Sequence, residues 1–248
     1  MGSVALSRFW SVLLVFCTVC GIASADQIRL VTLEGGQNSR IRALVMEEAY
    51  SRAEIDVSFE IVPARRAAVM VETGQVDGET SRVFAYGNSR DYLIRLSTPI
   101  GHLHTTAFTR VDSPLAIDSL TAMEGLTVGV VRGIRHAERA AANASQVVFA
   151  KSIAELMKLV DHGRVDVAIH SRWAGELTIA SLGLETVIAQ NENLGSQSVH
   201  HFLRQEFAHE AARIDAVLQI MDQSGEILSI VERERAKVAE QLKAGTNG

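Results

Sequence analysis

The amino-acid sequence predicts an α/β protein that folds as two lobes. Strand-like and helix-like segments alternate through its first part, which is typical of a mostly parallel sheet covered by helices. The alternation stops at residues 111–114, a turn-forming Val-Asp-Ser-Pro cluster, and then begins again. A strand-like segment at residues 198–205 and two terminal helices follow. We expect them to return the chain to the first lobe, so that two segments cross between the lobes.

In the first lobe, three strand-like segments are separated by two helix-like segments. Connections of this kind give parallel strands with right-handed crossovers. Asn38 or Ser39 can cap the first helix, and Gly74 can end the second one in the left-handed conformation. Residues 93–110 are extended and lead toward the second lobe. The predicted strands are 27–33, 57–61 and 76–83, and the predicted helices are 40–52 and 64–73.

The second lobe repeats this alternation. Ser152 and Glu155 form the S-x-x-E pattern of a capping box at the start of one helix. After the return strand, a periodic helix is interrupted at residues 224–225 and is followed by a charged helix that runs to about residue 243. The predicted strands are 126–131, 147–150 and 165–169, and the predicted helices are 119–124, 134–142, 152–160 and 209–222.

Residues 1–25 have the pattern of a secretory signal peptide. Arg8 precedes an apolar run at residues 9–22, and an A-x-A cleavage site ends at Ala25. Cleavage after Ala25 would leave a periplasmic protein. A lipoprotein anchored at a leader cysteine is less favoured, because bulky residues precede both cysteines where small ones are expected. The leader contains both cysteines of the chain, so the mature protein is expected to have neither a disulfide nor a thiol nucleophile.

The composition excludes several classes of function. With a formal net charge of −5, the chain has no basic surface for a nucleic acid. No second apolar run is long enough to cross a membrane, so the mature protein is not expected to be membrane-inserted. We expect no cofactor and no metal. A zinc site is the alternative, because His102 and His104 share one face of a strand while residues 200–201, both histidines, lie on the other crossing segment.

An arginine-rich stretch is the first candidate for a binding site. Arg65 and Arg66 fall in the first turn of a predicted helix, where the helix dipole disfavours cations. Arg82 and Arg90 follow near the end of the next strand. Guanidinium groups match carboxylates bidentately, so the stretch favours an anion site. The alternative is a solvated surface on which these arginines pair with the nearby carboxylates of Glu72, Glu79 and Asp91.

Five short patterns, spread over nearly all of the mature chain, carry a resemblance to a known family. In this order they resemble the family 3 extracellular solute-binding proteins, the periplasmic components associated with polar amino acid ABC transporters. The patterns are G-Q-V-D-G at 74–78, S-R-D at 89–91 with L-S-T-P at 96–99, G-L-T-V-G-V at 125–130 with Gly133, G-R-V-D at 163–166, and M-D-Q-S-G at 221–225.

The resemblance implies a type 2-like periplasmic binding protein fold, with two mostly parallel sheets flanked by helices and two crossing hinge strands. The first lobe would comprise residues 26–108 and 202–248, and the second lobe residues 109–201. The protein would be a monomer and not an enzyme. It would capture a small polar, anionic or amino-acid-like ligand and present it to a membrane permease. The alternatives are a ligand-binding module that feeds a membrane sensor and, less favoured, a periplasmic dehydratase-like enzyme.

The resemblance also assigns roles to residues, and two departures bear on the ligand. In amino-acid binders of this family, the arginine matching Arg90 holds the α-carboxylate. Ile134 stands where those proteins have a threonine that adds to it, and His170 stands where an aspartate holds the ammonium group. A neutral imidazole cannot replace that charge pairing. Arg66 and Arg82 would then be the natural pocket residues for an anionic group.

The remaining candidates lie after predicted strands, at the edge where ligands of such sheets bind. Glu34 follows the first strand, and Tyr86 can stack on a ligand or cover its loop. Arg135 stands with His136 at a helix N-terminus, a ready anion site. Trp173, like His170, follows the last strand of the second lobe, facing the ligand or packing in the core. A dehydratase would need Glu79 or Glu34 as general acid.

Overall fold

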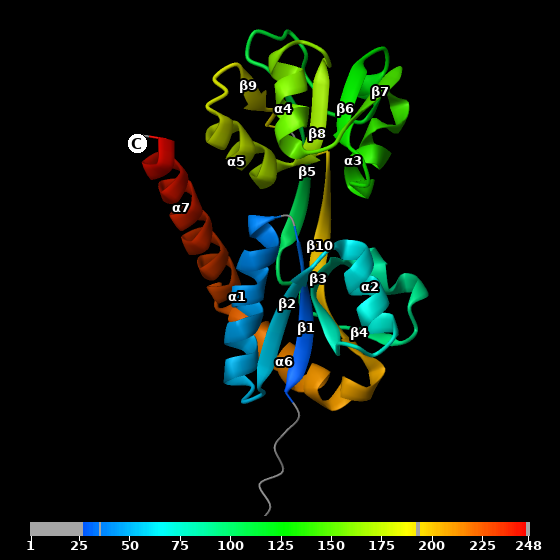
Figure 1. Ribbon diagram of the computed structural model, residues 1–248, viewed down its shortest axis with the longest axis vertical. Coiled ribbons are helices and arrows are strands. Elements are labelled where there is room, and N and C mark those ends of the chain that lie inside the picture. Colours follow the sequence, from blue (N-terminus) through cyan, green and yellow to red (C-terminus); the bar gives the residue numbers. More distant parts are fainter. Residues whose placement is uncertain (1–26, 35, 192–193, 247–248) are drawn as a thin grey trace, which may run out of the picture.

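The computed structural model describes residues 27–34, 36–191 and 194–246. The predicted signal peptide, including Cys17 and Cys20, lies outside the described residues. Among the described residues, ten strands are joined in one sheet: eight follow a continuous path and two more pair beside it, so that each lobe contributes its own part. Figure 1 shows the two lobes one above the other, joined by two long strands. These are β5 (His102–Arg110) and β10 (Gly195–Arg204).

The first lobe has a parallel core of three strands with helices on both faces. β1 pairs with β2 and β3 in parallel, and β10 continues the sheet in antiparallel orientation. Helices α1 and α6 pack on one face and α2 on the other. The elements are β1 (Ile28–Leu33), α1 (Gln37–Arg52), β2 (Val57–Val62), α2 (Ala64–Glu72), β3 (Gly78–Val83), the 3-10 turn η1 (Phe84–Ser89), β4 (Leu93–Arg95), the turn η4 (Gln205–Phe207) and α6 (Ala208–Gln223).

The second lobe repeats this arrangement. β6 pairs in parallel with β7 and β8, while β8 and β9 both pair with β5 in antiparallel orientation. Its elements are η2 (Thr121–Met123), β6 (Thr127–Val131), α3 (Arg135–Ala140), η3 (Ala141–Asn143), β7 (Gln146–Ala150), α4 (Ile153–Asp161), β8 (Val167–Ser171), α5 (Arg172–Leu182) and β9 (Val187–Ala189).

Alternation along the strands separates two apolar clusters in each lobe. In β1, Leu30 joins the cluster beneath α1 and α6, and its neighbour Val31 joins the cluster beneath α2. In β5, Ala107 packs toward α3 and Phe108 packs toward α4 and α5. Successive residues of a strand point to opposite faces, so each lobe buries its own core on both sides of its sheet.

Most predicted elements lie within a few residues of their expected positions, but several details differ. The structure adds α5 and β9, which the sequence pattern did not predict, and reduces the predicted helix at 119–124 to the turn η2. α1 begins after Gly36 without a side-chain cap, so Asn38 lies inside the helix and is not its N-cap. The capping box is confirmed at Ser152, whose hydroxyl accepts from the Glu155 amide at 3.1 Å. The Glu155 carboxylate, however, accepts from the amide of Lys151, not from that of Ser152.

The last helix, α7 (Glu226–Thr246), departs further from the expectation. Its first turns pack on the first lobe through Ile227 and Ile230, as predicted. It then continues beside α1 to the second lobe, where it contacts α5. The guanidinium carbon of Arg235 lies 5.0 Å from the centre of the Trp173 ring. Figure 1 shows α7 in red running along both lobes.

Strand directions decide which ends of the sheet face the other lobe. β5 runs from the first lobe into the second, and β8 is antiparallel to it, so β8 ends toward the first lobe. β10 runs back into the first lobe, and β3 is antiparallel to it, so β3 ends toward the second lobe. The carboxyl ends of the parallel strands of the two lobes therefore point at each other. The residues at which the lobes divide, predicted at 108/109 and 201/202, stay a prediction, because both positions lie within continuous strands.

Gly175, in the helix that the sequence did not predict, packs closely against a ring of the second lobe. A Cβ placed on it would lie 2.0 Å from the Cζ atom of the buried Phe108 ring. We expect Gly175→Ala to lower the free energy of unfolding by about 1–3 kcal/mol through overpacking, as measured by urea denaturation. The Gly175→Ala/Phe108→Leu double variant should be less destabilised than the sum of its single changes. Strict additivity would contradict this explanation.

Candidate functional site

Three of the predicted residues form one cluster at the end of β3. The Tyr86 ring has the guanidinium carbon of Arg82 4.5 Å from its centre and that of Arg90 3.9 Å from its centre. Arg90 also donates from Nη1 to the Tyr86 carbonyl at 2.6 Å. Cations over an aromatic face are attracted by its quadrupole, so the two arginines and the tyrosine hold one another in place.

The buried carboxylate of Glu79 anchors this cluster. Its side chain is 0% exposed, and it accepts from Nε of Arg82 and from the hydroxyl of Tyr86. Burial, followed by the charge of Glu79, raises the pKa of Tyr86, so the phenol stays protonated and remains the donor. Arg82 also donates from Nη2 to the Ala64 carbonyl at 3.0 Å. Because both oxygens of Glu79 are engaged, the geometry does not favour it as a general acid.

The other first-lobe candidates lie apart from this cluster. Arg66 is exposed on α2 and its Nη2 lies 3.6 Å from Oε1 of Glu60. Arg65 is exposed beside it, and Glu34 is exposed just after β1. The structure thus brings Arg82, Tyr86 and Arg90 together but leaves the other three in solvent contact. A ligand role for each of them stays a prediction.

In the second lobe, two imidazoles meet at the end of β8. The rings of His136 and His170 pack edge to face with their centres 6.0 Å apart. Nδ1 of His136 lies 3.0 Å from the Thr105 hydroxyl, and Nδ1 of His170 lies 3.3 Å from the Ser171 hydroxyl. Burial lowers the pKa of each histidine to about 4, with Arg139 adding to the effect at His136 and His136 at His170.

The histidine pair therefore presents neutral rings at pH 7. A neutral ring can donate or accept a hydrogen bond but cannot neutralise an ammonium group. Arg135 is exposed beside the pair at the start of α3, and Ile134 packs against the core of this lobe. The sequence indicates His136 only as a neighbour of Arg135, whereas the ring contact places it against His170.

Trp173 lies in a different place from His170. It lines a cavity of about 110 Å³ with His104 and Arg235, next to a larger cavity of about 290 Å³. Thr105 faces His136, whereas its neighbour His104 lines both cavities, and successive strand residues point to opposite sides. Trp173 therefore belongs to the side of β5 that faces α1 and α7.

The four histidines of the crossing strands do not form a metal centre. The rings of His102 and His104 stack with their centres 6.1 Å apart. His200 contacts the Leu96 carbonyl and the Ser198 hydroxyl, each at 2.9 Å, which occupies both ring nitrogens. His201 likewise contacts the Glu79 carbonyl and the Tyr50 hydroxyl at 2.9 Å. Within the described ranges, no group of three or more His, Cys, Asp or Glu residues is placed to hold a metal ion.

No protein-family model matches the chain. A protein of Shewanella oneidensis, described only as uncharacterised, is 32% identical to it over 162 residues. That stretch spans 62% of this chain and 61% of the relative, so the chain matches less than two thirds of the relative's length.

Solved structures give a clearer comparison. A histidine kinase sensor domain with similarity to periplasmic binding proteins has a TM-score of 0.67 and 21% identity, over 84% of this chain and 95% of that one. The fold is that of the periplasmic binding proteins. The amino acid ABC transporter substrate-binding protein AbpA from Streptococcus pneumoniae, bound to L-arginine, has a TM-score of 0.63 and 13% identity, over 86% and 95% of the chains. At such low sequence identities, the similarity indicates a shared fold but does not indicate which ligand this chain binds. No helix among the described residues has the length and apolar character needed to cross a membrane.

Proposed function

We propose that this chain is a periplasmic solute-binding protein of the family 3 type, exported by cleavage after Ala25. It captures a small anionic molecule between its lobes and presents it to a membrane permease. The proposal rests above all on one observation, that the strand ends facing each other carry the Arg82–Tyr86–Arg90 cluster on one lobe and the His136–His170 pair on the other. Ligands of open α/β sheets bind outside these ends of the strands.

The chemistry of the two groups favours an acid without an amino group. Arg90 would supply a cation for a carboxylate, with Arg82 and Arg135 beside it or across from it. The neutral imidazoles of the second lobe would donate hydrogen bonds to further oxygen atoms of the ligand. Because neither group contains a carboxylate that is available to an ammonium ion, ordinary amino acids fit this site less well than organic acids.

Capture would work by a hinge motion about β5 and β10. A ligand shifts the equilibrium between open and closed lobes only by as much as it binds the closed form more tightly. Contacts made with Arg90 of one lobe and His170 of the other exist together only in the closed form. These contacts would therefore make the ligand bind the closed form more tightly than the open form. The closed protein would then be the species that a partner recognises.

A sensor module is the second candidate. It is favoured by the sensor domain of the histidine kinase, which has the higher identity and TM-score of the two structures compared. The two functions differ in what the captured ligand does next. Deleting the gene should abolish uptake of the ligand by the cell if the protein serves a permease, and should leave uptake unchanged if it serves a sensor.

Ligand binding is tested by thermal shift with a panel of dicarboxylates, other small organic acids and amino acids. A ligand at about 100 times its dissociation constant stabilises the native state by roughly 2.7 kcal/mol, which shifts the melting temperature by several degrees. We expect the hits to be acids without an amino group. Hits confined to amino acids would contradict the assignment of His170, and no hit at all would count against ligand capture.

Arg90 is the residue on which the site assignment is tested. Arg90→Met should weaken binding of the panel's best acid by about 1.5–3 kcal/mol, the value of a hydrogen bond to a charged group, as measured by isothermal titration calorimetry. Arg164→Met is the matched control, because Arg164 is exposed and precedes β8 at the end remote from the first lobe. Equal affinities of the two variants would remove Arg90 from the site.

A further inference from the structure

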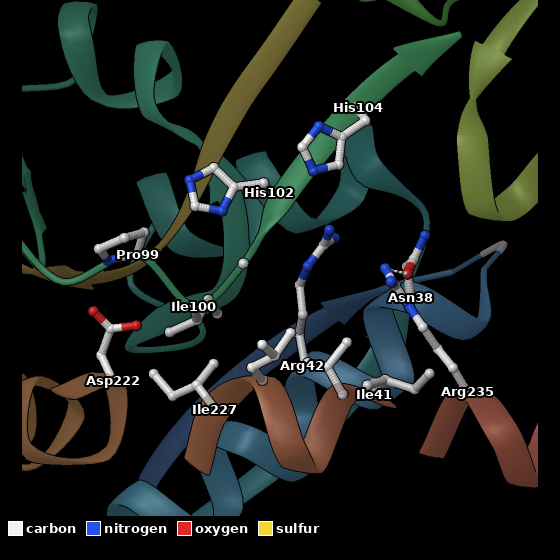
Figure 2. Close-up of a pocket in the computed structure, with 13 residues that line it drawn as sticks. Asn38, Ile41, Arg42, Pro99, Ile100, His102, His104, Asp222, Ile227 and Arg235 are labelled. Atoms are coloured by element: carbon white, nitrogen blue, oxygen red, sulfur yellow. Dashed lines mark hydrogen bonds between the residues drawn. The ribbon is translucent and has the colours of Figure 1, made fainter. Parts of the chain in front are cut away.

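A second cluster of basic side chains lies around the cavity of about 290 Å³ between α1, β5 and α7. Arg42 comes from α1, Arg235 from α7, and His102 and His104 from β5. Figure 2 shows the Arg42 side chain rising between the two imidazoles and Asn38, with Arg235 reaching toward Asn38 from α7. None of these residues belongs to the site proposed above, and the strand alternation at His104 and Thr105 places the cavity on the other side of β5.

The two arginines differ from Arg82 in how their charge is compensated. Arg82 contacts a buried carboxylate, whereas within the described residues neither Arg42 nor Arg235 forms an ion pair. Arg235 donates from Nη2 to Oδ1 of Asn38 at 3.3 Å. Its Nε is buried and has no hydrogen-bond partner among the described residues.

The two guanidinium groups also repel each other. Burial, and then the charge of Arg235, lowers the pKa of Arg42 to about 10. Burial likewise lowers the pKa of Arg235. Both groups remain cations at pH 7. Both residues are partly buried, and partly buried charges of the same sign without an ion-pair partner are costly; a donor without an acceptor adds to that cost.

The carboxylates nearby compensate this charge only in part. The charges of Glu176 and Glu232 raise the pKa of Arg235, but burial outweighs them. Asp222 lines the cavity, but Figure 2 shows it at the far end beside Pro99 and away from both guanidinium groups. Glu176 lines the adjoining small cavity, where its Oε1 lies 3.2 Å from Nη1 of Arg172. Arg42 and Arg235 therefore line the cavity without forming an ion pair with either of these lining carboxylates.

We propose that this cavity is a second ligand site, which binds a small doubly charged oxyanion between Arg42 and Arg235. An oxyanion offers two or more acceptor atoms to the terminal nitrogens of the two guanidinium groups. Asn38 and the imidazoles of His102 and His104 also line the cavity, and most of the remaining wall is apolar, with Ile100 and Ile227 among its residues. Phosphate and short dicarboxylates share this chemistry. The occupant would join α7 and α1 to the hinge strand β5, so it would tie the end of the chain to the element about which the lobes move.

The test uses isothermal titration calorimetry of the purified protein with inorganic phosphate and, separately, with succinate, at equal ionic strength set with potassium chloride. We expect saturable binding of at least one of them. A phosphate response alone identifies a phosphoryl ligand, and a succinate response alone identifies a dicarboxylate. Absence of saturable binding by either anion overturns the proposal.

Variants separate this site from the one between the lobes. Arg42→Met and Arg235→Met should each weaken anion binding by about 10- to 100-fold. Arg40→Met is the matched control, because Arg40 is an exposed arginine on the same helix that does not line the cavity. Arg90→Met should leave this binding unchanged even if it abolishes capture of the main ligand. Equal binding by Arg42→Met and Arg40→Met would overturn the assignment.

Folding of the variants provides a second check. Removing Arg42 also removes a like-charge repulsion, so Arg42→Met should be at least as stable as the wild type without phosphate and should lose the phosphate-induced rise in melting temperature. A variant that melts lower than the wild type in the absence of anions would contradict the uncompensated charge on which the proposal rests.

Discussion

Replacing Arg82 with methionine is expected to lower the free energy of unfolding by about 3–5 kcal/mol. The side chain of Glu79 is fully buried and only 13% of the Arg82 side chain is exposed, so the pair is screened little by water. Without Arg82, the Glu79 carboxylate would keep, among the described residues, only the Tyr86 hydroxyl as a side-chain donor. Urea denaturation of the variant and the wild type at pH 7 measures the difference.

Arg66→Met is the matched control for this prediction. Arg66 faces Glu60 at 3.6 Å, and more than half of each side chain is exposed, so its loss should change stability by at most about 1 kcal/mol. The Glu79→Gln/Arg82→Met double variant should recover part of the loss, because no buried charge is left unpaired. If Arg82→Met and Arg66→Met are equally stable, the buried pair does not contribute as described.

This result also bears on the choice of ligand-binding variants. Arg82 uses Nε for Glu79 and Nη2 for Ala64. A binding defect in an Arg82 variant would therefore combine a lost ligand contact with a loosened cluster. Arg90, whose hydrogen bond goes to a backbone carbonyl, is the better residue for testing ligand capture.

Lowering the pH from 7 to about 5 should destabilise the native state by several kcal/mol. Burial lowers the pKa of His136, His170 and His201 to about 4, whereas an unfolded histidine titrates near 6.5. Between these values the unfolded state binds more protons, so the free energy of unfolding falls as the pH drops through this range. Above about pH 7 both states are neutral at these positions and the effect is absent.

We expect on the order of 1–2 kcal/mol from each of these histidines at about pH 5. The measurement is a series of urea denaturation curves between about pH 5 and pH 8. His170→Asn should reduce the slope of stability against pH, whereas His209→Gln should not, because the His209 side chain is 79% exposed. A stability that does not change across this range would show that these histidines take up protons without cost.

Much of the fold could be predicted from the sequence because its strands are apolar runs that are separated by helices and by turn-forming residues. β1, β6 and β8 are buried runs of this kind, and the alternation of strands and helices dictates their parallel pairing. α5 was missed because its sequence mixes a glycine and polar residues with apolar ones. The reason for that glycine, the Phe108 ring, lies in another strand and leaves no local signal.

The same limit applies to the sites. Arg82, Tyr86 and Arg90 are near neighbours in the sequence, so their grouping could be predicted from one loop. Arg42 and Arg235 come from opposite ends of the chain, and only the course of α7 brings them together. A periodic helix reveals that it has a buried face but not which element covers that face, so the contact of α7 with the second lobe could not be predicted.

Helix α7 runs along both lobes on one side of β5 and β10, the two strands that would form the pivot of a hinge rotation. Figure 1 shows α1, α5 and α7 on one side of these strands and α2 and α3 on the other. A rotation about the pivot that brings the α2 and α3 sides of the lobes together must draw α5 away from α7. Under the proposed function, closure of the lobes would have to break the packing of Arg235 on Trp173, so this contact would oppose closure and the ligand's binding energy would have to exceed it.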